Sequence, residues 1–344
     1  MQTKHFAVLD GWRGLAVALV LIEHYFNIPN LGRLGVNLFF ALSGSLMAAS
    51  LWDQNIPLSR FFVRRAARVL PTFLVFVLAV YGVAFFMAPD RIDAGTLIPT
   101  LTFTRAYLPA NIGIWVTRLP LGHLWSLNVE EHAYIVLAIC AVITARNHKR
   151  AVIALVAVCS ISLSLKAIYA FSPPSGATQV VLRSEIAGFC IFVSTLATLC
   201  RHSIERWFGR VPAISILLAC LVLSVAPTLF KIHPRYHYVT HFVVPTLLAL
   251  CVVLVRVQNG IANMLLSGRV IGWLGLVSFS LYLWQQVPCT LVDQGVLNWF
   301  LPFALPGVIG FAALSYYFLE APARRYLRDF TLARQPLIDR QGIY

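Results

Sequence analysis

Charged residues are scarce in this sequence. Asp, Glu, Lys and Arg make up 12% of its 344 residues, whereas 59% are apolar and the mean hydropathy is +0.78. A soluble domain carries about one quarter charged residues, and so few charges cannot cover the surface of a water-soluble protein of this size. The composition therefore excludes an ordinary soluble enzyme and predicts an integral membrane protein.

Cysteine patterns that would indicate a disulfide framework or a zinc site are also missing. The seven cysteines are an odd set without a Cys-x-x-Cys pair, and most lie in apolar segments, where cysteine packs as a small hydrophobic residue. The N-terminal apolar run contains Arg13, Glu23 and His24 and lacks a small-residue cleavage site. We therefore predict a retained helix there and not a signal peptide.

Long apolar runs are abundant, and they set the predicted architecture. About 20 apolar residues cross a bilayer as a helix, and ten runs approach that length. These runs lie near residues 8–27, 35–52, 69–88, 121–145, 151–171, 179–200, 212–230, 237–256, 270–290 and 298–319. We predict an all-α polytopic membrane protein with about ten transmembrane helices, made of one membrane domain (residues 1–325) and a polar tail (residues 326–344).

The distribution of positive charge predicts the orientation. Lys and Arg concentrate in the cytoplasmic loops of membrane proteins, and most of the 27 Lys and Arg residues fall in segments that are cytoplasmic if the N-terminus is inside. The prediction is therefore N-in and C-in, with a cytoplasmic tail. The net charge of +14 then reflects topology and attraction to the anionic headgroups of the lipid bilayer, so nucleic acid binding is not needed to explain it.

Ionisable residues inside a bilayer are costly, which makes them candidates for functional sites. Arg13 and His24 lie in the first predicted span. On a helix they face directions within about 20° of each other and lie about 16 Å apart along the axis. They either form a shared functional site, or Arg13 reaches the headgroups while His24 is a hydrogen-bonded packing residue.

The segment GHLWSLNVEEHAY, at the start of the fourth span, adds His123, Ser126, Glu130 and Glu131. Adjacent carboxylates point in different directions on a helix, so at most one of them can face a cavity lined by His24. Such a carboxylate could orient the histidine as a base, as in acyl-transfer enzymes. The alternative is a hydrogen bond or salt bridge between helices without a catalytic role.

The loop SRFFVRRAARVLP places Arg64, Arg65 and Arg68 just before Pro71. Arg65 and Arg68 are neighbours on one helix face, where planar guanidinium groups suit phosphate oxygens. Residue type alone leaves two interpretations open. The loop either anchors to lipid phosphates or binds a specific phosphate-bearing ligand.

Taken together, these segments resemble the bacterial acyltransferase-3 family of integral membrane O-acyltransferases. The similar motifs are, in order, LDGWRGLAVALVLIEH, GVNLFFALSG, FFVRRAARVLP, HLWSLNVEEHAY, SFSLYLWQQVP and YYFLEAPARR. They cover nearly the whole chain, so residues 1–325 resemble the transmembrane domain of this family. One position departs from the pattern: family members often have His after the Leu-Tyr-Leu-Trp run, where this chain has Gln285.

The resemblance implies a multi-pass enzyme of the bacterial cytoplasmic (inner) membrane. Family members transfer an acyl group, above all acetyl, from cytoplasmic acyl-CoA to a hydroxyl of a carbohydrate acceptor. That acceptor is a surface glycan, such as lipopolysaccharide or peptidoglycan, or a lipid-linked saccharide. The expected donor substrate is therefore acetyl-CoA, with no permanently bound cofactor.

The resemblance also implies roles for single residues. His24 matches the proposed catalytic histidine and Arg13 its essential partner. Arg65 and Arg68, with Arg64 beside them, match the loop proposed to hold the CoA phosphates. Glu130, as a catalytic candidate, and Glu320 match acidic motif positions whose roles are less settled. His24 would act either as a general base or as a transiently acylated nucleophile.

Two other interpretations of the sequence need weighing. A polytopic transporter or flippase of a lipid-linked saccharide would also bury charges, but no inverted repeat is visible. The spacing of His233, His237 and His241 would place them on one helical stripe that could bind a metal. Because Pro234 interrupts it and no carboxylate or cysteine completes the set, we predict no metal site and favour an interfacial or acceptor-binding role.

Overall fold

The computed structural model describes residues 2–92, 94–109, 114, 119–172, 174, 180–231, 235–255, 258, 261–295 and 301–333. Every regular element in these ranges is helical, so the all-α prediction is confirmed. The α-helices are α1 (Gln2–Phe26), α2 (Leu31–Ala48), α3 (Leu58–Met87), α4 (Ala94–Leu101), α5 (Trp125–Ile143), α6 (His148–Phe171), α7 (Ser184–Ala187), α8 (Phe189–Leu199), α9 (Arg201–Phe208), α10 (Ala213–Leu229), α11 (Arg235–Val255), α12 (Ile261–Leu266), α13 (Arg269–Leu276), α14 (Ser278–Trp284), α15 (Gln286–Asp293), α16 (Leu305–Ser315) and α17 (Ala321–Ala333).

Several of these helices are long and apolar enough to cross a membrane. Within the described residues five meet this condition, and the number rises to seven if two bent helix pairs each count as one span. The five are Leu31–Asp53, Leu58–Met87, Gly122–Ile143, His148–Phe171 and Leu301–Leu327. The bent pairs are Ser184–Leu199 with Arg201–Phe208 (80°) and Arg269–Leu276 with Ser278–Asp293 (64°). The chain is therefore a multi-pass membrane protein.

The remaining predicted spans coincide with helices of weaker membrane character. Helix α1 carries Asp10, Arg13 and Glu23, while Ala213–Leu229 and Thr240–Val255 are shorter apolar helices. A span that lies inside a bundle can tolerate charges and a shorter apolar stretch, because neighbouring helices and not lipid surround it. The count of ten and the N-in, C-in orientation remain predictions.

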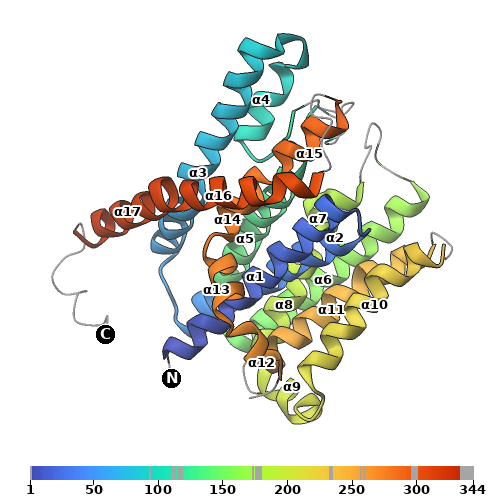
Figure 1. Cartoon of the computed structure of the whole chain (residues 1–344). Helices are drawn as coiled ribbons and strands as arrows, with labels where there is room; N and C mark the ends of the chain where they lie inside the picture. Colours follow the sequence, from blue (N-terminus) through green and yellow to red (C-terminus); the bar gives the residue numbers. More distant parts are fainter. Residues whose placement is uncertain are drawn as a thin grey trace.

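Helices α1, α2 and α8 lie side by side at the centre of the bundle (Figure 1). Helix α13 packs along α1, and α11 packs along α8. Glycine allows the close approach of these helices. A Cβ on Gly14 would lie 3.0 Å from the Gly275 nitrogen of α13, and a Cβ on Gly44 would lie 3.0 Å from the Ile191 carbonyl carbon of α8. Larger side chains at these two positions would force the helices apart.

Two asparagines form the turn between α1 and α2. Asn27 (φ 54°) and Asn30 (φ 68°) adopt the left-handed backbone conformation, which asparagine tolerates better than most residues. The Gly32 N–H of α2 donates a hydrogen bond to the Glu23 carboxylate, so a group at the start of α2 that lacks an intrahelical partner is satisfied by the end of α1. This turn places His24 in the last turn of α1.

Candidate active site

Two cavities lie along α1 and α2. The first, of about 270 Å³, is called the arginine cavity, and its lining includes Arg13, Ser43, Arg64, Arg65, Arg68, Ser126, Glu130 and Tyr134. The second, of about 260 Å³, is called the histidine cavity, and its lining includes Glu23, His24, Arg33, His123, Trp125 and Leu182. Val36 of α2 and Tyr282 of α14 line both cavities.

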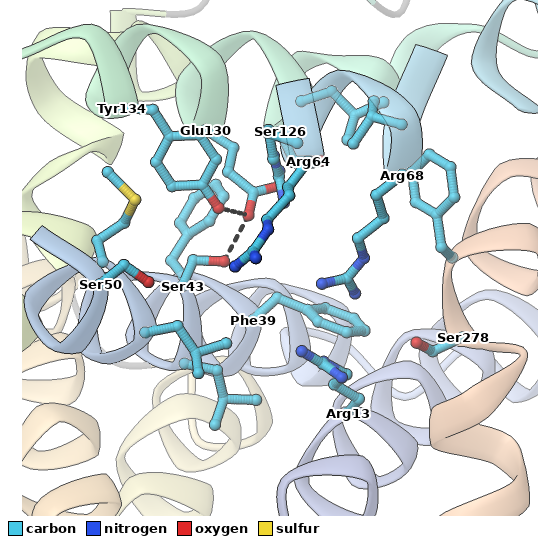
Figure 2. Close-up of a pocket in the computed structure, with 18 of the residues that line it drawn as sticks. Arg13, Phe39, Ser43, Ser50, Arg64, Arg68, Ser126, Glu130, Tyr134 and Ser278 are labelled. Atoms are coloured by element: carbon cyan, nitrogen blue, oxygen red, sulfur yellow. Dashed lines mark hydrogen bonds and ion pairs between the residues drawn. The ribbon is translucent and has the colours of Figure 1, made fainter. Parts of the chain in front are cut away.

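Three guanidinium groups extend into the arginine cavity from two helices. Arg13 comes from α1, whereas Arg64 and Arg68 come from adjacent turns of α3, and Arg13 and Arg68 approach from opposite sides of Phe39 (Figure 2). Arg13 Nη1 lies 3.0 Å from Asp10 Oδ1. In the described part of the chain, neither Arg64 nor Arg68 forms a hydrogen bond or ion pair. The cavity thus holds positive charge that an anion can balance.

Arg65 is surrounded differently. Its Nη2 lies 2.5 Å from Glu130 Oε2, its Nε lies 3.1 Å from Glu131 Oε1, and its guanidinium carbon lies 4.4 Å from the centre of the Tyr134 ring. Glu130 also accepts hydrogen bonds from the hydroxyls of Ser43 and Tyr134 (Figure 2). This network joins α2, α3 and α5. The guanidinium group of Arg65 is already paired with two carboxylates. Arg65 and Arg68, the predicted phosphate-binding pair, therefore have different surroundings.

His24 lines the other cavity and contacts the joint between α14 and α15. Its Nδ1 lies 2.6 Å from Oε1 of Gln285, a residue with 0% exposure. The next residue on α1, Tyr25, donates a hydrogen bond of 2.9 Å from its hydroxyl to the Gln285 backbone carbonyl. Two successive residues of α1 are therefore bound to the same glutamine.

His123 adds a second imidazole to the histidine cavity. It lies in a short 3₁₀ helix, Gly122–Leu124, that leads into α5, and it packs against the rings of Phe76 and Tyr282 with centroid distances of 5.7 and 5.3 Å. Its exposure is 2%, and neither ring nitrogen hydrogen-bonds to a described residue. An unsatisfied buried polar group costs about 1–3 kcal/mol. His123 can therefore hydrogen-bond to a molecule that enters the cavity.

Tyr282 stands where the two cavities meet. Its hydroxyl donates to the His123 backbone carbonyl at 2.9 Å and lies 2.7 Å from Ser126 Oγ. Together with Val36, the Tyr282 ring forms the shared wall. Tyr282 and Val36 are therefore in contact with both cavities.

The structure separates the predicted site residues into two groups. The arginine cavity collects Arg13, Arg64, Arg65, Arg68 and Glu130, whereas His24 lies in the histidine cavity. Glu130, predicted as a catalytic carboxylate, therefore lies with the arginines. Among the described residues, the carboxylate that lines the histidine cavity is Glu23 of α1.

Sequence reasoning left three residues of the site without a role. Tyr134 follows Glu130 by four residues, a spacing that places both on one helix face and could have revealed their contact. Tyr282 and Gln285 lie in the LYLWQ motif, but their neighbours come from α1 and from the segment before α5. No local pattern identifies such distant partners.

Two other predicted features lie elsewhere. Glu320 is buried, with 1% exposure, and accepts a hydrogen bond of 2.8 Å from Ser280. It therefore joins α14 to the π-helical segment Tyr316–Glu320, which leads into α17. His233 and the side chain of His237 lie outside the described residues. His241 contacts the guanidinium group of Arg33, which lines the histidine cavity.

Comparison with known proteins gives the family. The model of the acyltransferase-3 family, described as an acyltransferase domain, matches residues 6–320. The peptidoglycan O-acetyltransferase OatA of Listeria monocytogenes is 24% identical over 94% of this chain and 56% of its own length. YrhL of Bacillus subtilis, named as a presumed peptidoglycan O-acetyltransferase, is 26% identical over 93% of this chain and 55% of its own length.

A protein of Staphylococcus aureus strain COL, named as a presumed O-acetyltransferase, is also 26% identical, over 94% of this chain and 58% of its own length. The chain thus spans a little over half the length of these curated relatives. No solved structure gives a significant match. Because the family model matches nearly the whole chain, this protein belongs to the acyltransferase-3 family of membrane acyltransferases.

Proposed function

We propose that this protein transfers an acetyl group from cytoplasmic acetyl-CoA to a hydroxyl of a cell-surface or lipid-linked carbohydrate in the bacterial inner membrane. The observation that carries the proposal is the pair of cavities, one cationic and one lined by His24, that meet at Val36 and Tyr282. The names of the relatives point to a peptidoglycan-type glycan as the acceptor.

The donor site is the arginine cavity. CoA carries its negative charge on phosphate groups, and guanidinium groups bind phosphate oxygens through planar pairs of hydrogen bonds. Arg64, Arg68 and Arg13 supply these groups, while Arg65 holds Glu130 in place. The pantetheine arm then extends along the cavity and brings the thioester to the wall at Tyr282.

The acceptor site is the histidine cavity. The Trp125 indole offers an aromatic face for the apolar side of a sugar ring, and Glu23, Arg33 and His123 offer acceptors and donors for its hydroxyls. A cavity with a few convergent polar groups in an otherwise apolar wall is the usual form of a small-molecule site.

His24 performs the chemistry as a general base. Its Nε2 takes the proton of the acceptor hydroxyl as the oxygen bonds to the thioester carbon, the carbon–sulfur bond breaks, and the CoA thiolate then takes a proton from the imidazolium. A positioned general base contributes roughly 10²–10⁴ in rate. In the alternative order the acetyl group bonds first to Nε2 and then moves to the hydroxyl, with the same atoms exchanged.

The test is acetyl transfer by the purified protein in lipid nanodiscs. The assay would supply [¹⁴C]acetyl-CoA and chitotetraose, a soluble oligosaccharide that stands in for a glycan strand, and would compare His24→Ala with His202→Ala. His202 is a matched control because its side chain is 81% exposed on α9. We expect the first variant to lose roughly 10²-fold or more in rate and the second to keep its activity.

Two outcomes bear on the proposal and its mechanism. Transfer by His24→Ala at the wild-type rate would overturn the catalytic assignment. Radiolabel that stays on the protein when no acceptor is present, and disappears in His24→Ala, would support the acyl-histidine order. Release of CoA in step with product, without retained label, would support direct transfer.

A further inference from the structure

We propose that Gln285 is a positioning residue that holds His24 in one tautomer and keeps its Nε2 free for reaction in the histidine cavity. The kinetic part of this inference rests on the proposed function, whereas the tautomer itself is a property of the resting protein. Gln285 follows Trp284 at the joint between α14 and α15.

Gln285 is fixed relative to the last turn of α1. Its backbone carbonyl accepts hydrogen bonds from the Tyr25 hydroxyl at 2.9 Å and from the Cys289 thiol at 3.3 Å. Its side chain has no exposed surface. Tyr25 is the neighbour of His24 in the chain. The hydrogen bond from Tyr25 to the Gln285 backbone therefore also fixes the position of the His24 imidazole relative to the Gln285 amide.

The side-chain contact selects the tautomer. Gln285 Oε1 lies 2.6 Å from His24 Nδ1, and an amide oxygen can only accept a hydrogen bond. In this orientation of the amide, the Gln285 Nε2 group is buried without a hydrogen-bond partner among the described residues. The proton of a neutral imidazole then sits on Nδ1, which leaves the lone pair on Nε2. An imidazole in this state can remove a proton from a hydroxyl or attack a thioester, whereas the opposite tautomer carries a proton at the reacting nitrogen.

Glutamine gives this arrangement a property that histidine would not. A histidine partner can donate or accept and gains or loses a proton near neutral pH, while an amide does neither. The pH dependence of the reaction then comes from His24 and from the titratable or charged groups around it. These are Glu23 on the same helix, Arg33 of α2, His123 before α5, and the hydroxyls of Tyr25 and Tyr282.

The first experiment reads the tautomer without any substrate. Protein labelled with [¹⁵N]histidine would be placed in nanodiscs for solid-state NMR, with His24→Ala used to identify the His24 signals. We expect a protonated Nδ1 and an unprotonated Nε2 in the wild type, and loss of this pattern in Gln285→Met. The matched control is Gln286→Met, the same change one residue later, which should leave the pattern intact. A wild-type His24 protonated at Nε2, or no change in Gln285→Met, would overturn the inference.

The second experiment measures kinetics. Gln285→Met should lower kcat for acetyl transfer by about 10- to 100-fold, the usual effect of losing a partner that orients a histidine, and should leave KM for acetyl-CoA unchanged because the arginine cavity is intact. Gln285→Glu keeps an accepting oxygen and should retain activity. Its negative charge should move the acid limb of the pH–rate profile to higher pH by about one unit.

The two experiments separate the possible failures. If Gln285→Glu is as inactive as Gln285→Met although its His24 tautomer is unchanged, the assigned positioning role is wrong. If every protein shows the expected tautomers but none transfers acetyl groups, the proposed function is wrong and the tautomer assignment is supported. A merely structural role for Gln285 would predict equal losses in both variants and no shift of the pH–rate profile.

Discussion

Arg65 and Arg68 stand one turn apart on α3, yet we expect their loss to have opposite consequences. The side chain of Arg65 is 13% exposed and contacts two carboxylates whose side chains are 15% and 21% exposed. Arg65→Met would leave Glu130 and Glu131 without their cation. Breaking a buried ion pair on one side costs about 3–5 kcal/mol, so this variant should be markedly less stable.

Arg68→Met should instead weaken the binding of the donor. Because Arg68 has no ion pair or hydrogen bond within the described part of the chain, its removal should change stability by only about 0.5 kcal/mol. A hydrogen bond to a charged group contributes about 1.5–3 kcal/mol. If Arg68 binds a CoA phosphate, KM for acetyl-CoA should rise by about 10- to 100-fold.

The assay measures both properties on the same preparations. Thermal unfolding in detergent would report stability, and release of the CoA thiol at varied acetyl-CoA concentration would report KM. The double variant Arg65→Met/Glu130→Gln serves as a control, because removing one of the stranded carboxylates should restore part of the lost stability.

The reverse pattern would refute the reasoning. A stable Arg65→Met protein with a raised KM would mean that Arg65 binds the donor and that its contacts with Glu130 and Glu131 are incidental. A destabilised Arg68→Met protein with an unchanged KM would mean that Arg68 is a structural residue.

Three further predictions follow from the packing around the cavities. Tyr282→Ala removes the larger part of the shared wall and leaves Val36, so more water from the histidine cavity should reach the thioester. A coupled thiol assay should show faster acetyl-CoA hydrolysis without acceptor, and an unchanged rate would contradict the role of Tyr282 in the wall. His123→Phe replaces two unsatisfied ring nitrogens by apolar atoms, so the unfolding temperature should hold or rise while KM for chitotetraose increases. Gly44→Val forces side-chain atoms against Ile191 of α8 and should destabilise the protein by about 1–3 kcal/mol. Thermal unfolding would measure this loss. The control is Gly82→Val, because a Cβ at Gly82 meets open space.

Much of the architecture could be predicted because it depends on composition along the chain. Apolar runs long enough to cross a bilayer predicted an all-α membrane protein, and the motifs around Arg13, Arg65 and Glu130 indicated the family. Helical periodicity placed Arg13 and His24 on one stripe of one helix, about 16 Å apart, but it did not show that they line different cavities. Local spacing is sufficient for these features because each lies within a single helix or follows from average hydropathy.

Partners across helices were decided by the tertiary structure alone. The spacing in the sequence predicts that Arg65 and Arg68 act as a pair. In the structure, Arg65 forms ion pairs with Glu130 and Glu131 of α5, whereas Arg68 faces the cavity. Likewise, Gln285 meets His24 only because α1 packs against the joint of α14 and α15. Hydropathy predicts that a residue is buried, but it does not predict which distant side chain will contact that residue. The contact depends on how the helices are arranged. Only the tertiary structure forms this site, in which a cationic cavity lies beside the cavity that contains His24.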